Sequence, residues 1–129
     1  MSIVIVDDSA TNLIVLKHLA KSHGERQVLT FVKPEDARDH LSSNKADLLI
    51  VDCEMPGIDG ISFIREMRRL SQHRETPIIM VTSHSDGAIR HEALSAGATD
   101  FLSKPVDANE FKMRVRNLLG LKSGRAATV

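Results

Sequence analysis

Short apolar runs recur along the chain, and three of them are continuous rather than alternating with polar residues. Continuous runs of this length are typical of central strands in a parallel sheet, because helices cover both faces of such strands. The pattern predicts five strands, over residues 3–6, 28–32, 48–51, 78–81 and, more weakly, 99–103.

Between these runs, apolar residues recur three and four positions apart, the spacing that gathers side chains on one face of a helix. Helix-capping residues, proline and glycine mark several of the expected ends. The spacing predicts five helices: one that begins after Asp8-Ser9 and ends at Gly24, one opened by Pro34, one after Gly60, one over residues 88–96, and one carrying Phe111, Val115, Leu118 and Leu119.

Strict alternation of strands and helices predicts an α/β fold with a doubly wound, five-stranded parallel sheet and helices on both faces. Residues 1–119 are expected to form this one domain. The segment from Gly120 to Val129 is small and weakly basic, and is expected to be a C-terminal tail or linker.

Composition excludes several other classes of protein. Of the 129 residues, 42% are hydrophobic and 26% are charged, as in globular domains. The formal net charge is zero, and Trp and Tyr are absent, so nucleic acid is not expected as a direct partner. A single cysteine, Cys53, excludes an internal disulfide. Without a signal peptide or a membrane-length apolar run, a cytoplasmic protein is expected.

Polar residues follow four of the predicted strands at the point where each strand ends. These residues are Asp7 and Asp8, Asp52, Thr82, and Lys104. In an open α/β sheet the carboxyl ends of the strands form the ligand-binding edge, so these side chains are expected to meet there.

Three carboxylates in one pocket need neutralisation, because two of them about 4 Å apart repel by roughly 4 kcal/mol. A proton or a divalent cation could supply it, and an all-oxygen site with room for water favours Mg²⁺. A carboxylate beside Mg²⁺ can attack phosphorus and form an acyl phosphate. Asp52 would be this nucleophile, and Thr82 and Lys104 would stabilise the phosphoryl oxygens.

Four motifs together resemble the receiver domains of bacterial two-component response regulators, from about residue 3 to residue 119. The order and approximate spacing of the motifs are similar to those of that family. They are Val6-Asp7-Asp8-Ser9, the segment Val51-Asp52-Cys53-Glu54-Met55-Pro56-Gly57-Ile58-Asp59-Gly60, Met80-Val81-Thr82-Ser83, and Ala96-Gly97-Ala98-Thr99-Asp100-Phe101-Leu102-Ser103-Lys104-Pro105.

The resemblance implies a flavodoxin-like strand order, 2-1-3-4-5, and a role for each acidic residue. Asp52 would be the modified residue, and Mg²⁺ would be held by Asp52, directly by Asp8, by Asp7 mostly through water, and by the backbone carbonyl of Glu54. The side chain of Glu54 is expected to flank the path of attacking water, as is that of His84.

The resemblance also implies a switch. Thr82 would hydrogen-bond the phosphoryl group, Lys104 would pair with it, and Phe101 would swing inward on activation. The Lys104–Pro105 peptide bond is expected to be cis.

As a receiver domain, the chain would take its phosphoryl group from a sensor histidine kinase or a phosphotransfer protein. It would signal to an output domain or partner, including a second copy of itself, through the fourth helix, fifth strand and fifth helix. No enzymatic activity is expected beyond self-phosphotransfer and autodephosphorylation. Residues 111–119 resemble the last helix of receivers linked to cyclic-di-GMP turnover domains.

Each motif taken singly has a simpler explanation, such as helix capping by Asp7 and Asp8 or a solvated strand end at Asp52. Three other functions are weighed against this interpretation. A haloacid-dehalogenase-type phosphohydrolase would place its nucleophile after strand one in a D-x-D arrangement, whereas here the two aspartates are adjacent. A docking module that needs no phosphorylation would be expected to lack Asp52, Thr82 or Lys104. A nucleotide-binding enzyme would need a glycine-rich loop after strand one, which the sequence lacks.

Overall fold

The protein is described by a computed structural model that covers residues 2–21, 27–83 and 87–122, without the side chains of residues 121 and 122. Its strands are β1 (Ser2–Val6), β2 (Gln27–Phe31), β3 (Leu48–Asp52), β4 (Ile78–Thr82) and β5 (Asp100–Ser103). Its helices are α1 (Ala10–Lys21), α2 (Pro34–Ser43), α3 (Gly60–Arg69), α4 (Gly87–Ala96) and α5 (Ala108–Lys122), with a short 3-10 helix at Ser71–His73.

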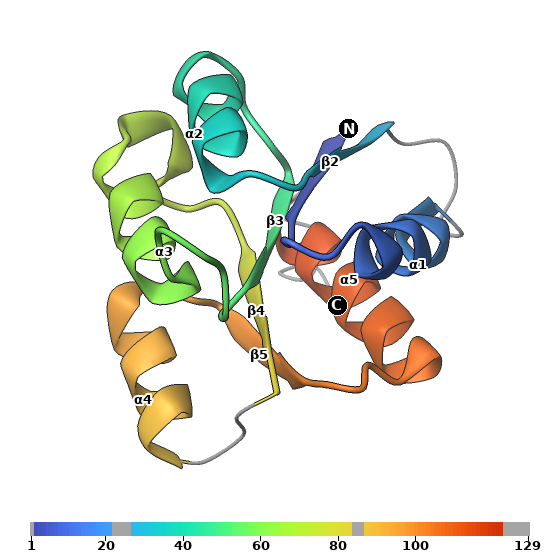
Figure 1. The fold of residues 1–129 in the computed structure, drawn as a ribbon. Coiled ribbons are helices and arrows are strands. Elements are labelled where there is room, and N and C mark those ends of the chain that lie inside the picture. The colour runs from blue at the N-terminus through green and yellow to red at the C-terminus, as the bar shows by residue number, and fades with distance from the viewer. Residues whose placement is uncertain (1, 22–26, 84–86, 123–129) are drawn as a thin grey trace.

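The strands form one parallel sheet in the order β2-β1-β3-β4-β5, which confirms the predicted fold class and strand order. Helices α1 and α5 cover one face, and α2, α3 and α4 cover the other (Figure 1). Pairing of Val6 with Val51, and of Thr82 with Ser103, brings the carboxyl ends of the strands to one edge. The loops that carry the polar motifs therefore lie side by side.

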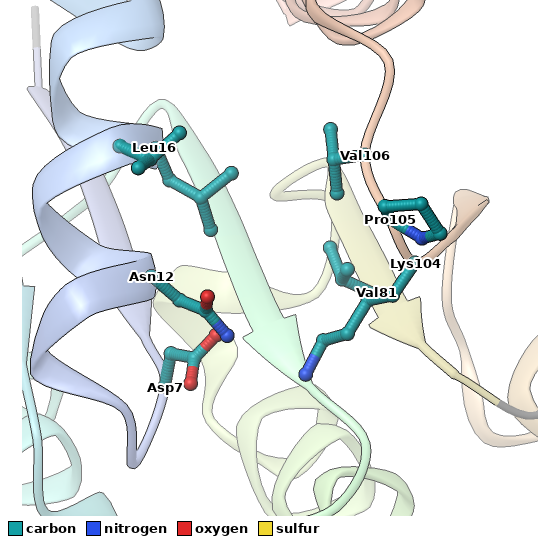
Figure 2. Close-up of a pocket in the computed structure, with 8 residues that line it drawn as sticks. Asp7, Asn12, Leu16, Val81, Lys104, Pro105 and Val106 are labelled. Atoms are coloured by element: carbon teal, nitrogen blue, oxygen red, sulfur yellow. The ribbon is translucent and has the colours of Figure 1, made fainter.

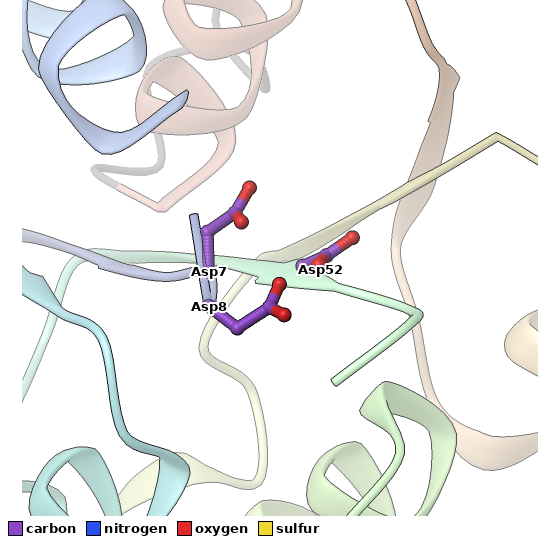
Figure 3. A group of neighbouring side chains, drawn as sticks. All are labelled: Asp7, Asp8 and Asp52. Carbon is purple, nitrogen blue, oxygen red and sulfur yellow. The ribbon is translucent and has the colours of Figure 1, made fainter. Parts of the chain in front are cut away.

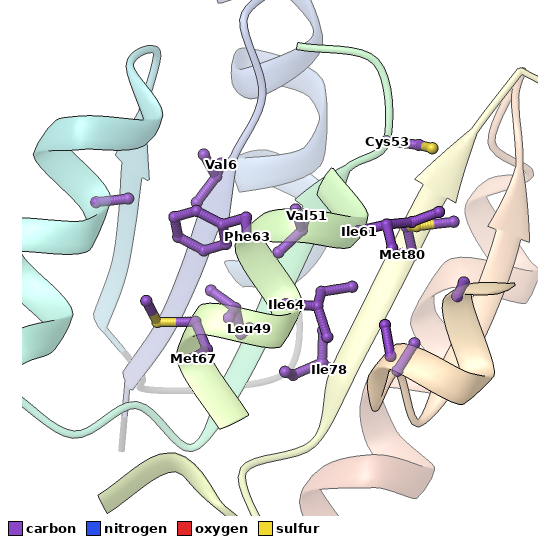
Figure 4. Close-up of a cluster of buried hydrophobic side chains, with 14 of the residues drawn as sticks. Val6, Leu49, Val51, Cys53, Ile61, Phe63, Ile64, Met67, Ile78 and Met80 are labelled. Atoms are coloured by element: carbon purple, nitrogen blue, oxygen red, sulfur yellow. The ribbon is translucent and has the colours of Figure 1, made fainter. Parts of the chain in front are cut away.

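Alternate residues of each central strand enter two different hydrophobic clusters, one on each face of the sheet. Ile3 and Ile5 pack with α1 and α5, whereas Val4 and Val6 pack with α2, α3 and α4. Figure 4 shows side chains of α3, among them Phe63, pointing onto β1, β3 and β4. Burial on both faces explains why the central strands are continuous apolar runs.

The expected element ends differ from the observed ones in a few places. The first helix was expected to end at Gly24, which lies outside the described residues. The last helix continues to Lys122, so the first three residues of the expected tail are helical. The 3-10 helix was not predicted, because three residues are too few to show a periodicity.

Arg68, near the end of α3, joins two connections through backbone carbonyl groups, the one between α3 and β4 and the one between α4 and β5. Its guanidinium donates to the carbonyl of Gly97 at 2.7 and 3.0 Å, and to those of His73 and Thr76 at 2.7 Å each. Gly97 has a φ of +119°, and a Cβ there would also collide with the Arg68 side chain. Arg68 therefore fixes the end of α4 against the start of β4.

None of the helices within the described residues has the length and apolar character needed to cross a membrane.

Candidate functional site

Three carboxylates gather beyond the ends of β1 and β3 (Figure 3). Asp7 and Asp8 directly follow β1, and Asp52 is the last residue of β3. One oxygen from each of the three lies within 4.8 Å of the others. Asp7 and Asp52 are almost fully buried, at 1% and 2% exposure, while Asp8 is exposed. The predicted acidic cluster is therefore present.

The local backbone fixes how these carboxylates point. Asp7 Oδ1 accepts a hydrogen bond from the backbone N–H of Ser9 at 2.9 Å, and the Ser9 hydroxyl caps α1 by accepting from Asn12 N–H at 3.2 Å. Beside Asp52, the N–H of Gly60 donates to the Cys53 carbonyl at 2.9 Å. A Cβ on Gly60 would collide with the Asp52 backbone carbonyl. Glycine therefore lets the loop after β3 turn back tightly against the site.

Lys104 completes the charged cluster from the loop after β5. Its Nζ donates to Asp52 Oδ1 at 2.7 Å, and its backbone N–H donates to the Thr82 carbonyl at 2.8 Å. The Lys104–Pro105 peptide bond is cis, which confirms that prediction. Lys104 thus places a cation directly against the buried carboxylate of Asp52.

Burial sets the protonation of the site. It raises the pKa of Asp52 to about 6, an effect that the hydrogen bond from Lys104 opposes and the negative charge of Asp7 reinforces. Burial also raises the pKa of Asp7, against the hydrogen bond from Ser9. Burial lowers the pKa of Lys104, but the hydrogen bond and charge of Asp52 outweigh it and the net pKa is raised. Burial therefore favours the neutral form of both carboxyl groups, while Lys104 keeps its positive charge beside them.

Two oxygens in this site fit a bound cation. Asp7 Oδ2 and Asp52 Oδ2 are buried, and neither accepts a hydrogen bond from the residues that the structure describes. A buried carboxylate oxygen without a partner is costly, and a hard cation that prefers oxygen ligands would satisfy both atoms. The donor set of Asp7, Asp8 and Asp52 therefore fits Mg²⁺.

Thr82 lies at the end of β4, where the sequence places it, but its hydroxyl is engaged by another residue. It is fully buried and donates a hydrogen bond of 2.5 Å to Glu54 Oε2. Glu54 Oε1 accepts from the Ser83 hydroxyl at 2.9 Å and from the Ser83 N–H at 3.2 Å. Although burial raises the pKa of Glu54, these hydrogen bonds outweigh it and hold the net pKa below its usual value.

Phe101 lies in β5 and is only 9% exposed, packed into the cluster beneath α2, α3 and α4. The Arg90 guanidinium of α4 lies 5.0 Å from the centre of its ring, within the range of a cation–π contact. The ring is thus already buried here, and its inward movement on activation stays a prediction. His84 lies outside the described residues.

A pocket of about 250 Å³ adjoins the acidic cluster between α1 and the loop after β5 (Figure 2). Asp7, Asn12 and Lys104 lie at one end, and Leu16 and Val106 at the other. The cluster therefore opens onto a partly apolar surface.

Two contacts of the site were missed in the sequence. The sequence prediction includes Ser83 only as part of a motif and does not include Arg90. The adjacent hydroxyl residues Thr82 and Ser83, at the end of β4, could have suggested a polar partner for Glu54. The Arg90 contact leaves no such signal, because the fold alone brings α4 over β5.

Comparison with known proteins gives the family. A family model described as the response regulator receiver domain matches residues 3–116. The chemotaxis protein CheY homolog of Campylobacter jejuni is 31% identical over 128 residues, which cover 98% of each chain. The cyclic di-GMP phosphodiesterase response regulator RpfG of Xanthomonas campestris is 42% identical over 123 residues, 95% of this chain. The chain spans only about a third of RpfG, 32% of its length.

Solved structures agree with this result. Chemotaxis response regulator CheY4 of Vibrio cholerae is 26% identical with a TM-score of 0.85, over 91% of this chain and 97% of that one. The receiver domain of sensor histidine kinase PA1611 from Pseudomonas aeruginosa is 28% identical with a TM-score of 0.83, over 92% and 97%. That structure has a magnesium ion coordinated in its active site cleft. The chain therefore belongs to the response regulator receiver domain family.

Proposed function

We propose that this receiver domain accepts a phosphoryl group on Asp52 and that the modification switches its signalling surface. The observation that carries the proposal is the buried Asp52 side chain, with Oδ1 held by Lys104 and Oδ2 without a hydrogen-bond partner in the described part of the chain. The carboxylate therefore has an oxygen that no described residue occupies, as bonding to phosphorus and to a metal ion requires.

The proposed reaction transfers a phosphoryl group from a donor to Asp52. An oxygen of Asp52 attacks phosphorus, forming a P–O bond, while the bond from phosphorus to the donor breaks and its electron pair leaves with the donor group. Lys104 stays protonated throughout, because the surrounding carboxylates raise its pKa. Its charge, and the hydroxyl of Thr82 once that hydroxyl is released, would stabilise the phosphoryl oxygens.

Mg²⁺ would be held by Asp7, Asp8, Asp52 and the backbone carbonyl of Glu54. When bound, it would offset the negative charge of the carboxylates and of the incoming phosphoryl group. The two buried oxygens without partners, Asp7 Oδ2 and Asp52 Oδ2, support this assignment.

Receiver domains interact with histidine kinases and output domains. For this chain, we place the donor, a sensor histidine kinase or phosphotransfer protein, at the acidic edge of the sheet. We place the readout on the surface of α4, β5 and α5, where an output domain, a partner protein or a second copy would bind. Leu94 of α4 and Met113 of α5 are about half exposed and support this choice.

Labelling of Asp52 tests the proposed function directly. After incubation with acetyl phosphate and Mg²⁺, mass spectrometry should find one added phosphoryl group on the wild type and none on Asp52→Asn. Asp39→Asn, an exposed aspartate of α2, is the matched control and should label normally. Equal labelling of Asp52→Asn and wild type would refute the assignment.

The similarity to RpfG favours a more specific role, as the receiver part of a cyclic-di-GMP-related regulator. The coding sequence beyond Val129 tests it. A phosphodiesterase domain there would support this role, and a DNA-binding domain would contradict it.

A further inference from the structure

The carboxylate of Glu54 joins the loop after β3 to the end of β4. Its two oxygens accept three hydrogen bonds, one from the Thr82 hydroxyl and two from Ser83. Thr82 is fully buried, and its bond to Glu54 is the shortest of the three. Both residues that follow Val81 are therefore held by one side chain.

This contact conflicts with the role proposed for Thr82. A threonine hydroxyl carries one proton, so it can donate only one strong hydrogen bond at a time. While Thr82 donates to Glu54, the same proton is not available to a phosphoryl group on Asp52. The two acceptors must compete for it.

The charge at Asp52 decides whether Glu54 or the phosphoryl group accepts the hydrogen bond of Thr82. Glu54 is close enough to Asp52 for its negative charge to raise the pKa of that carboxyl. A phosphoryl group adds negative charge at Asp52, so it repels Glu54 and at the same time attracts the proton of Thr82. Phosphorylation therefore weakens one acceptor and strengthens the other.

We propose that Glu54 is a resting-state latch, which holds Thr82 and Ser83 away from the phosphoryl site until charge at Asp52 displaces it. The proposal rests on the proposed function of Asp52. It gives Glu54 a positioning role through Thr82, separate from the metal-binding role of its backbone carbonyl. Removing the side chain should move the resting protein toward the activated conformation.

The test is an NMR titration with beryllofluoride, which mimics the phosphoryl group. In Glu54→Ala without beryllofluoride, the resonances of Thr82 and Ser83 should already lie part of the way toward their bound positions. Half-saturation should need a roughly tenfold lower concentration than in wild type, equivalent to about 1.4 kcal/mol. Glu66→Ala, which removes a carboxylate of α3 paired with Arg38, is the control and should match wild type.

Removing any negative charge near Asp52 would tighten beryllofluoride binding, so a double-mutant cycle must separate charge from the latch. Thr82→Val keeps the buried shape but has no hydroxyl to compete for. In the Thr82→Val background, Glu54→Ala should raise the affinity for beryllofluoride only about twofold to threefold, because only the loss of a nearby negative charge then contributes. The latch would be overturned if Glu54→Ala raised the affinity for beryllofluoride equally in the wild-type and Thr82→Val backgrounds and left the resonances of the resting protein unshifted.

Labelling of the same wild-type sample distinguishes failure of the latch from failure of the proposed function of Asp52. If acetyl phosphate labels Asp52 and the cycle shows no coupling, the latch alone is wrong. If the wild type neither labels nor binds beryllofluoride in the presence of Mg²⁺, the proposed function is wrong and the latch falls with it.

Discussion

Lys104 Nζ donates a hydrogen bond of 2.7 Å to Asp52 Oδ1, although the two residues are 52 positions apart in the chain. The lysine side chain is 25% exposed and the aspartate side chain 1%, so the cation reaches in from the surface to a buried anion. This pair satisfies one oxygen of Asp52, while the other accepts no hydrogen bond from the residues that the structure describes.

Breaking this pair should destabilise the fold. In Lys104→Met, the Asp52 carboxylate stays buried without its cation, which should lower the free energy of unfolding by about 1–3 kcal/mol at neutral pH. Urea denaturation measures the loss. Lys45→Met, at an exposed lysine, should show no comparable effect.

The double variant Lys104→Met with Asp52→Asn should recover most of that stability, because no charge is then left unpaired. If the double variant were as unstable as Lys104→Met alone, the cost would lie in lost packing of the lysine stem and not in the ion pair.

Asp52 should make stability depend on pH in an unusual direction. Its pKa in the folded protein is about 6, above the unfolded value of 3.8, so between these values only the folded state keeps the proton. The stability that this proton contributes is full below the unfolded pKa and is lost as pH rises through the folded pKa. Relative to Asp52→Asn, the wild type should lose about 1–3 kcal/mol between about pH 4 and pH 7.

Denaturation of both proteins across this range, without Mg²⁺, gives the difference at each pH. A flat difference would mean that Asp52 titrates at its ordinary value when folded. A difference that grows in favour of the wild type as pH rises would give the opposite sign and contradict the burial argument.

Mg²⁺ should stabilise the fold, because it binds carboxylates that the folded state brings together. Linkage predicts a gain of about 2.7 kcal/mol at a hundredfold excess over the dissociation constant. Thermal melts with and without Mg²⁺ measure it. The gain should fall more in Asp8→Ala than in Asp7→Ala, since one oxygen of Asp7 already accepts the Ser9 N–H. A full gain in Asp8→Ala would exclude Asp8 as a ligand.

The sequence was sufficient for the sheet and for the gathering of the acidic cluster. Residues 48–51 and 78–81 are apolar without interruption because both faces of β3 and β4 are buried. This pattern does not depend on how the individual side chains pack. Asp7 and Asp52 meet because parallel strands end at the same edge.

Contacts that depend on loop conformation could not be predicted from the sequence. Glu54 was expected to act at the site, but its hydrogen bonds to Thr82 and Ser83 depend on one rotamer and one loop path. Arg68 binds backbone carbonyls, which every residue carries, so no pattern marks its partners. Such contacts follow from the fold and do not specify it.

Thr82→Ala should separate modification from response. The variant should still take a phosphoryl group on Asp52, because the attacking oxygen is intact. Moving a switch from 1:99 to 99:1 needs about 5.5 kcal/mol, and one hydrogen bond to a charged group gives about 1.5–3 kcal/mol. Lys104 alone is therefore too little. NMR shifts of Phe101 and of residues 88–96 on adding beryllofluoride should be much smaller than in wild type.

The wild-type shifts are the reference for that experiment. If they are absent on α4 and β5, or if Thr82→Ala shows the full set, the signal reaches the surface by another route.

Arg68→Ala should cost about 2–4 kcal/mol in the free energy of unfolding, because it leaves several carbonyls without their donor. Arg68→Lys should recover little, since an ammonium cannot span the carbonyls of Gly97 and Thr76 as the planar guanidinium does. Thermal melts compare both with Arg69→Ala, at the exposed neighbouring position. Equal loss in Arg69→Ala would point to the helix itself and not to the carbonyls.

The sheet divides the interior into two hydrophobic clusters that alternate residues of the same strands supply. Leu16, Phe111 and Val115 belong to one cluster, while the packing beneath α4 belongs to the other. Substitutions in different clusters should therefore be close to additive in their effect on stability. Packing between α1 and the sheet can therefore be strengthened or weakened with little effect on the packing beneath α4. One small domain thus offers two sets of core positions at which stability can be adjusted separately.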